Sequence, residues 1–182
     1  MFEVVLYEPE IPPNTGNIIR LCAATGARLH LIEPLGFRLD DRALRRAGLD
    51  YHEFAVINRH GSFTEFREHH VIGRVFAFTT SGSCSLYSAR FEPGDALLFG
   101  AETRGLPAEI RNSLPVAHQL RIPMLQERRS LNLANAVAIG LYEALRQCDS
   151  LACSTTLGVP AALNSMDTDQ LESTLSNPLY HR

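Results

Sequence analysis

The chain has 182 residues, of which 45% are hydrophobic and 20% charged, a composition typical of one globular domain with a substantial core. The net charge of −3 excludes a uniformly basic nucleic-acid-binding protein, so any RNA site must be a local patch built from the 17 basic residues, all of them arginine. No segment is long and apolar enough to cross a bilayer, and the N-terminus is acidic where a signal peptide is basic. We therefore expect a cytoplasmic protein.

The first half of the chain predicts buried strands that alternate with helices. Residues 2–7 are β-branched and aromatic, as in a buried strand. Two prolines then keep the loop extended until a helix over 15–25, with Asn14 or Thr15 as its N-cap and Gly26 as its stop signal. The same alternation continues with a strand over 28–33, a helix over 40–51, a strand over 53–57 and a helix over 62–70 capped by Ser62.

The second half repeats this alternation. The clearest helix covers 130–147, where apolar residues recur at i, i+3 and i+4. Strands that are apolar throughout and separated by helices indicate an α/β fold, with a mostly parallel sheet and helices on both faces. Residues 1–148 form the single predicted domain, and the Ser- and Thr-rich residues 149–182 an appendage, loosely packed or disordered. The remaining predicted elements are strands over 74–80, 95–100 and 118–123 and a helix over 106–114.

Four loops that follow predicted strands indicate a small-molecule site, because ligands of such sheets bind beyond the carboxyl ends of the strands. Several positions in them have a purely structural alternative: Gly100 could serve a turn, Glu102 could cap the next helix, and Ser130 or Asn132 could cap the last one. The nucleotide-binding patterns GxGxxG and GxxxxGK[ST] and the metal-binding pattern HExxH are absent, so we expect no metal. The loops are EPEIPPNTGN, TTSGS, FGAETRGLP and RIPMLQERRSLN.

Three segments resemble the signature motifs of the SPOUT (SpoU-type) RNA 2′-O-methyltransferases: EPEIPPNTGNIIRLCAATG, FGAETRGLP and IPMLQERRSLNLANAVAIGLYEALRQ. A fourth, GFRLDDRALRRAGLDYHEF, resembles the group that methylates the wobble nucleotide of tRNA, the TrmL or YibK group. The resemblance covers about residues 1–147. It implies S-adenosyl-L-methionine as cofactor, a C-terminal trefoil knot, a homodimer, and the tRNA anticodon loop as partner. The implied target is the 2′-hydroxyl of nucleotide 34, a cytidine or modified uridine, in leucine tRNAs.

The resemblance also implies site residues. Arg20 and Asn14 are the catalytic candidates. With Asn17 they form one polar stripe on an apolar helix, and the structural alternative is that this stripe simply faces water. A guanidinium stays protonated, so Arg20 would stabilise the developing alkoxide or hold the adjacent phosphate rather than act as a base. The cofactor-binding candidates are Phe78, Thr79, Gly100, Glu102, Ile122, Ser130 and Leu131.

Four arginines are candidates for RNA contacts: Arg42, Arg45, Arg46 and Arg104. The first three cluster at helical spacing, and their structural alternative is a solvated face beside Asp40. Two other functions stay open, a 2′-O-methyltransferase acting on ribosomal RNA or another tRNA position, and an RNA-binding module without catalysis. Titration with S-adenosylmethionine distinguishes the second from an enzyme.

Overall fold

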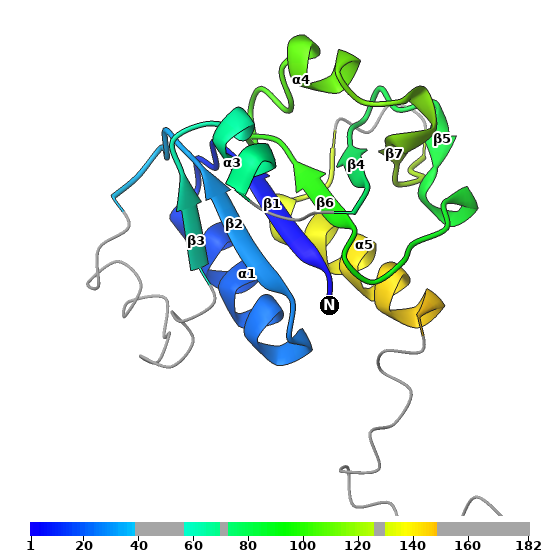
Figure 1. The fold of residues 1–182 in the computed structure, drawn as a ribbon, viewed down its shortest axis with the longest axis horizontal. Coiled ribbons are helices and arrows are strands. Elements are labelled where there is room, and N and C mark those ends of the chain that lie inside the picture. Colours follow the sequence, from blue (N-terminus) through cyan, green and yellow to red (C-terminus); the bar gives the residue numbers. More distant parts are fainter. Residues whose placement is uncertain (39–56, 70–72, 126–129, 149–182) are drawn as a thin grey trace, which may run out of the picture. The chain divides into compact units, whose positions relative to one another are not determined.

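The computed structural model describes residues 1–38, 57–69, 73–125 and 130–148. Within these residues, one parallel sheet has the strand order β3-β2-β1-β6-β4-β7-β5 (Figure 1). The strands are β1 (Glu3–Tyr7), β2 (Arg28–Ile32), β3 (Ile57–His60), β4 (Val75–Phe78), β5 (Cys84–Ser85), β6 (Ala96–Phe99) and β7 (Gln119–Arg121). The helices are α1 (Pro12–Thr25), α3 (Phe63–His69), α4 (Ala108–Asn112) and α5 (Leu133–Gln147), with 3-10 turns η2 (Leu86–Ser88) and η3 (Val116–His118).

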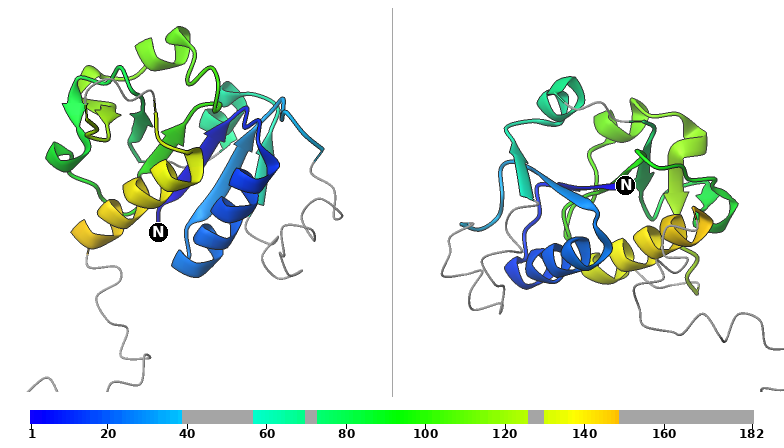
Figure 2. Two further views of the ribbon diagram at one scale, coloured as in Figure 1. Left: turned by 180° about the vertical axis from the view of Figure 1, so that it is seen from behind. Right: turned by 60° about the horizontal axis from the view of Figure 1, so that its bottom comes forward.

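Helices cover both faces of the sheet. Helices α1 and α5 lie side by side on one face (Figures 1 and 2), where Ile18 and Val137 pack against sheet residues such as Leu6. On the other face, Phe66 of α3 and the α4 region pack against residues such as Leu98. The expected α/β fold with a parallel sheet between helices is therefore confirmed, and the trefoil knot stays a prediction. None of the helices in the described ranges has the length and hydropathy to cross a membrane.

The start of α1 differs from the prediction. The helix begins at Pro12, after Ile11 as N-cap, so Asn14 lies inside the first turn instead of capping it. The first turn of a helix can accommodate the two prolines, because the N–H groups that prolines lack would have no intrahelical partner there. At the other end, Gly26 has a φ of 73° in the left-handed region, which confirms the stop signal.

Two strands of the sheet were not predicted from the sequence because they are polar or very short. Strand β3 runs from Ile57 to His60 through two polar residues. The strand expected over 53–57 lies outside the described residues except for Ile57 and stays a prediction. The two-residue β5 is too short for any pattern in the sequence. The helix expected over 40–51 and the appendage over 149–182 also fall outside the described residues.

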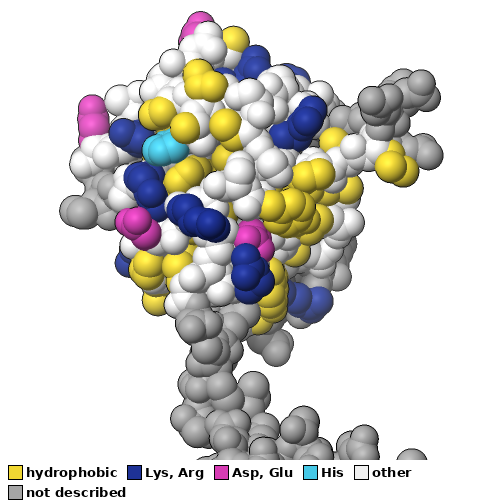
Figure 3. Space-filling view, turned by 90° about the vertical axis from the view of Figure 1, so that its right-hand side faces the viewer, with side chains coloured by type: hydrophobic (Ala, Val, Ile, Leu, Met, Phe, Trp, Pro, Cys, Tyr) yellow, Lys and Arg dark blue, Asp and Glu magenta, His cyan; other side chains and the backbone are white. Residues whose placement is uncertain are grey.

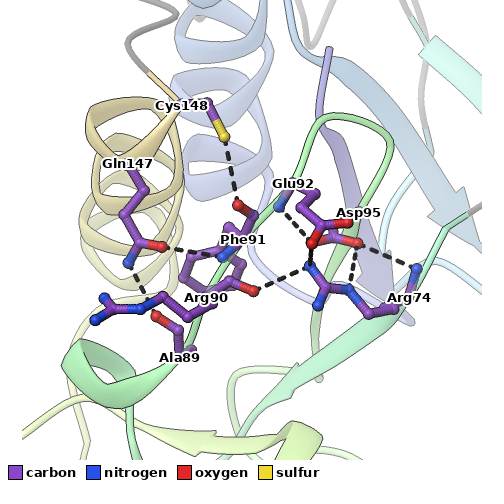
Figure 4. A network of polar contacts seen from close by, with 8 residues as sticks. All are labelled: Arg74, Ala89, Arg90, Phe91, Glu92, Asp95, Gln147 and Cys148. Atoms are coloured by element: carbon purple, nitrogen blue, oxygen red, sulfur yellow. Dashed lines mark hydrogen bonds and ion pairs between the residues drawn. The ribbon is translucent and has the colours of Figure 1, made fainter.

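A polar network holds the C-terminal end of α5 against the segment before β6 (Figure 4). The Gln147 side chain donates to the carbonyl of Ala89 at 3.1 Å and accepts from the amide of Phe91 at 2.9 Å. In the same segment, Asp95 accepts from the guanidinium of Arg74 at 3.1 and 2.8 Å. The two bonds of Gln147 fix one end of α5, and the other end of the helix lies at the cavity described next.

Candidate functional site

A cavity of about 770 Å³ opens at the carboxyl edge of the sheet. Strand β1 pairs with β2 on one side and β6 on the other, so the strand order reverses between β1 and β6, where ligands of open α/β sheets bind. All four loops expected to form the site contribute to its walls. The cavity lining includes every residue expected to bind the cofactor: Phe78, Thr79, Gly100, Glu102, Ile122, Ser130 and Leu131.

The loop after β6 depends on two glycines for different reasons. A Cβ at Gly100 would lie 2.2 Å from the carbonyl carbon of Gly105 and 2.3 Å from the amide nitrogen of Leu106, so no side chain fits there. Gly105 has a φ of +65° and its amide donates to the carbonyl of Ala101 at 2.8 Å. The loop therefore folds back on itself, and all of its residues from Gly100 to Gly105 line the cavity.

Glu102 joins this loop to the start of α1. Its carboxylate accepts from the amides of Glu10 at 2.7 Å and Ile11 at 3.2 Å, and from Nδ2 of Asn14 at 2.9 Å. The structural alternative that Glu102 caps the following helix is therefore wrong. No described side chain caps α1, and Glu102 instead holds the two backbone amides that directly precede the helix, from 92 and 91 residues away.

Asn132 links α5 to the same group. Its Oδ1 accepts from the amides of Ala134 at 3.0 Å and Asn135 at 3.3 Å, which confirms it as the N-cap of α5. Its Nδ2 donates to Oδ1 of Asn14 at 2.9 Å. Both ends of the buried Asn14 amide are thus engaged, and the series Glu102–Asn14–Asn132 holds three segments of the cavity wall together.

Arg20 lies six residues beyond Asn14 on α1, at an exposed position outside the cavity lining. The expected polar stripe is divided, because Asn14 is buried while Asn17 and Arg20 are exposed. The expectation of one continuous stripe is therefore wrong, and the water-facing alternative holds for its second half. The catalytic role of Arg20 stays a prediction.

Arg104 lies at the edge of the cavity, with a side chain that is 65% exposed. Its guanidinium pairs with Glu8 at 3.1 Å and Glu10 at 3.3 Å. Hydrogen bonds from the Thr103 side chain and amide, with a smaller contribution from Arg104, lower the pKa of Glu10. The other expected RNA-contacting residues, Arg42, Arg45 and Arg46, fall outside the described residues.

Phe78 forms part of the apolar wall of the cavity. Its ring stacks on Phe99 with centroids 4.4 Å apart and is only 8% exposed. A Cβ at Gly140 of α5 would lie 2.7 Å from the Phe78 ring, so this glycine lets the helix approach the phenylalanine. Phe78 therefore lies mostly in the core, and its ring can pack against α5 only because residue 140 has no side chain.

Some polar cavity residues were not named as candidates from the sequence. Ser81 and Arg121 lie in loops expected to form the site, whereas Arg111 lies outside all four loops. Arg111 belongs to the five-residue helix α4, and its Nη1 donates to Oγ of Ser81 at 2.6 Å. The sequence around these two arginines contains no motif that would distinguish them from ordinary surface arginines. Within the described ranges, no cluster of His, Cys, Asp or Glu is arranged to hold a metal ion.

The profile of the SpoU rRNA Methylase family matches residues 1–142, which is most of the chain. The chain belongs to this family. The resemblance seen in the sequence motifs is thereby confirmed, and membership makes the protein a methyltransferase.

Individual relatives agree with this assignment. The tRNA (cytidine(34)-2′-O)-methyltransferase of Aeromonas hydrophila is 62% identical over 147 residues, which cover 81% of this chain and 94% of that protein. A solved structure concerned with the 2-OH methylation of C/U34 on tRNA is 53% identical, with a TM-score of 0.75 and coverage of 81% and 95%. The SpoU methyltransferase AviRb of Streptomyces viridochromogenes, solved with AdoMet, is 29% identical with a TM-score of 0.68 and coverage of 80% and 57%.

Proposed function

We propose that this protein transfers a methyl group from S-adenosylmethionine to the ribose 2′-hydroxyl of nucleotide 34 in tRNA. The proposed substrates are leucine tRNAs with a cytidine or modified uridine at that position. The observation that carries the proposal is the cavity at the β1–β6 junction, whose walls contain all seven residues expected to bind the cofactor. The name of the 62% identical relative supports the choice of nucleotide.

The cavity fits this cofactor. Its volume of about 770 Å³ lies within the range of roughly 300–1,000 Å³ for small-molecule sites. Apolar side chains of Phe78, Ile122 and Leu131 line one part, and the backbone of the Gly100–Gly105 loop lines another. The apolar part suits an adenine ring and the backbone groups suit the polar ends of a nucleoside. When bound there, S-adenosylmethionine supplies the electrophilic methyl group.

The residues of the chain contribute mainly by positioning. Glu102, Asn14 and Asn132 hold the loop after β6, α1 and α5 in one arrangement, so the methyl donor and the hydroxyl meet in a fixed geometry. Arg20 would act on the RNA side of the reaction. Its guanidinium stays protonated, so it would stabilise negative charge on the 2′-oxygen, or hold the adjacent phosphate while that phosphate or water accepts the proton.

Selection of nucleotide 34 has to come from outside the reacting atoms, because every ribose carries the same 2′-hydroxyl. The single-stranded anticodon loop offers bases and a backbone that can be splayed open. Arg104 and the arginines at 42, 45 and 46 would hold its phosphates without reading its sequence. Arginine predominates among the charged side chains on the side of the molecule that carries β5 and β7 (Figure 3).

A homodimer would double this basic surface. Ile139 and Tyr142, which are three residues apart on α5 and therefore neighbours on its surface, are 36% and 48% exposed. Apolar side chains exposed close together are typical of protein–protein contacts. We propose that this part of α5 contacts a second copy of the chain. An active monomer would contradict this proposal.

The test of the proposed function uses purified protein, methyl-labelled S-adenosylmethionine and bulk tRNA. Nuclease digestion and mass spectrometry then locate the label. We expect it on the ribose of nucleotide 34, and assays with individual transcripts should favour leucine tRNAs. Label on a base, or on a ribose outside the anticodon loop, would contradict the assignment, as would the absence of label from tRNA.

A further inference from the structure

Among the residues that the structure describes, two arginines of the cavity have no acidic partner. Within the described part of the chain, neither Arg111 nor Arg121 forms an ion pair, whereas Arg104 pairs with both Glu8 and Glu10. The Nε atom of Arg111 is buried and has no hydrogen-bond partner. Buried donors are almost always paired, so this one marks a place where an acceptor is missing.

The Arg111 guanidinium is held in place. Its Nη1 donates to Oγ of Ser81 at 2.6 Å, and Ser81 lies within hydrogen-bonding distance, 3.0 Å, of the Thr79 hydroxyl. The carbonyl of Arg111 accepts from Nε2 of Gln119 at 2.9 Å. These contacts tie α4 to the loop after β4, so the guanidinium is positioned before any ligand arrives.

The charge of the described cavity wall indicates which kind of ligand is absent. Among the described lining residues, the charged ones are Glu102, Arg104, Arg111 and Arg121. Arg104 is already paired with Glu8 and Glu10, so the charges of Arg111 and Arg121 are the ones left without a counter-charge there. S-adenosylmethionine carries a sulfonium, an ammonium and a carboxylate, so its binding adds a further net positive charge. Like charges close together are unfavourable without a counter-ion. RNA, the second substrate of the proposed reaction, carries such an anion in its backbone phosphate.

We propose that Arg111, held by Ser81, and Arg121 together bind a backbone phosphate next to the nucleotide that is methylated. This inference rests on the proposed function and names part of its RNA-binding site. A guanidinium suits the task because it can donate two parallel hydrogen bonds to one phosphate. The contact would set the position of the ribose and would not discriminate between bases.

The experiment compares Arg111→Gln and Arg121→Gln with Arg67→Gln. Arg67 is an exposed residue of α3 outside the cavity lining, so its variant makes the same charge change elsewhere. Binding of a leucine tRNA transcript is measured across a salt series, and binding of S-adenosylmethionine by calorimetry. We expect each cavity variant to lose about tenfold in tRNA affinity and about one unit of salt slope. The cavity variants should keep a cofactor affinity within about twofold of wild type. The Arg67 variant should keep a tRNA affinity within the same limit, because an exposed charge far from the ligand contributes little to binding.

Two further variants separate phosphate binding from a structural role. Arg111→Lys keeps the charge and should retain the salt slope while losing part of the affinity. Ser81→Ala frees the guanidinium and should lower tRNA affinity without changing the slope. If Arg111 only supported the fold, melting temperature would change and salt slope would not, and this result would overturn the inference.

Other outcomes are equally decisive. Loss of cofactor affinity in Arg111→Gln with normal tRNA binding would assign the guanidinium to the carboxylate of the cofactor instead. Cavity variants that match Arg67→Gln would overturn the inference while the proposed function stands. A wild-type protein that neither binds nor methylates tRNA would overturn the proposed function, and this inference with it.

Discussion

Nδ2 of Asn132 donates a hydrogen bond of 2.9 Å to Oδ1 of Asn14, although 118 residues separate the two side chains in the sequence. Asn132 is at the same time the N-cap of α5, and Asn14 is at the same time a donor to Glu102. One short series of side chains thus fixes the starts of α1 and α5 relative to the loop after β6. The shape of the cavity depends on this arrangement.

Replacing Asn132 can separate its two roles. Serine at 132 keeps an oxygen for the helix cap but is too short to reach Asn14, whereas alanine loses both contacts. We expect Asn132→Ser to lower the free energy of unfolding by about 1 kcal/mol for the unpaired acceptor. Asn132→Ala should lose about 1 kcal/mol more for the cap. Denaturant unfolding would measure these losses, and calorimetric titration would measure S-adenosylmethionine affinity. A serine variant with normal cofactor affinity would contradict the role of the Asn14–Asn132 bond in shaping the cavity.

Arg20→Ala should abolish methyl transfer and leave cofactor binding close to wild type. The reason is that Arg20 is exposed on α1 and does not line the cavity. Single-turnover methylation and a separate titration with S-adenosylmethionine test the two halves. If cofactor binding disappears together with activity, Arg20 supports the fold or the cofactor, and its proposed role on the RNA is wrong.

Gly100→Ala and Gly105→Ala should differ in severity. At 100 the new methyl group would collide with backbone 2.2 Å away, so the loop must open and cofactor binding should be lost. At 105 nothing lies within 4 Å of an added Cβ, and the cost is that of a left-handed alanine, about 1 kcal/mol. Thermal melting and cofactor titration of both variants would check the difference. Equal behaviour would show that the backbone approach at Gly100 is not needed.

Stability should decrease in acid because of Glu3. This carboxylate is buried, which acts to raise its pKa, but hydrogen bonds from Arg28 and His30 outweigh burial and lower the pKa from 4.5 to about 2. Because the folded pKa is depressed, its contribution is complete above the unfolded pKa and is lost as pH falls from about 4.5 to 2. We expect a loss of roughly 3 kcal/mol over that interval.

The control for this effect is Glu3→Gln. Glutamine cannot ionise, so the variant should be less stable at neutral pH and should lose less stability between pH 5 and pH 3. Equilibrium unfolding in urea at several pH values measures both quantities. The same acid dependence in wild type and variant would assign the effect to other groups.

Truncation after Ser150 tests the proposal that residues 1–148 form the complete catalytic domain. The network around Gln147 completes the attachment of α5 within that range. We expect the melting temperature and the methylation rate of the shortened protein to stay close to those of the full chain. A large fall in either would show that residues 151–182 complete the fold or the site.

The sequence was enough to predict those parts of the site that depend on local pattern and on the order of the elements along the chain. Loops after parallel strands meet at one edge, so Thr79, Gly100 and Ile122 could be placed together without a structure. The role of Asn14 could not be predicted, because its partners Glu102 and Asn132 are distant in the sequence and no periodicity records such pairs. Arg111 was missed for a related reason, since only the folded chain shows that it lines the cavity and forms no ion pair with another described residue.

The separation between Asn14 and Asn132 also constrains the order of events during folding. Contacts between distant residues form late, because the chain must first lose the entropy of the intervening loop. Helix α1 and the loop after β6 precede α5 in the chain. The bond between Asn14 and Asn132 nevertheless requires that α5 has docked. In refolding, recovery of cofactor affinity should therefore coincide with the slowest kinetic phase, and a chain that ends before residue 132 should have no affinity to recover.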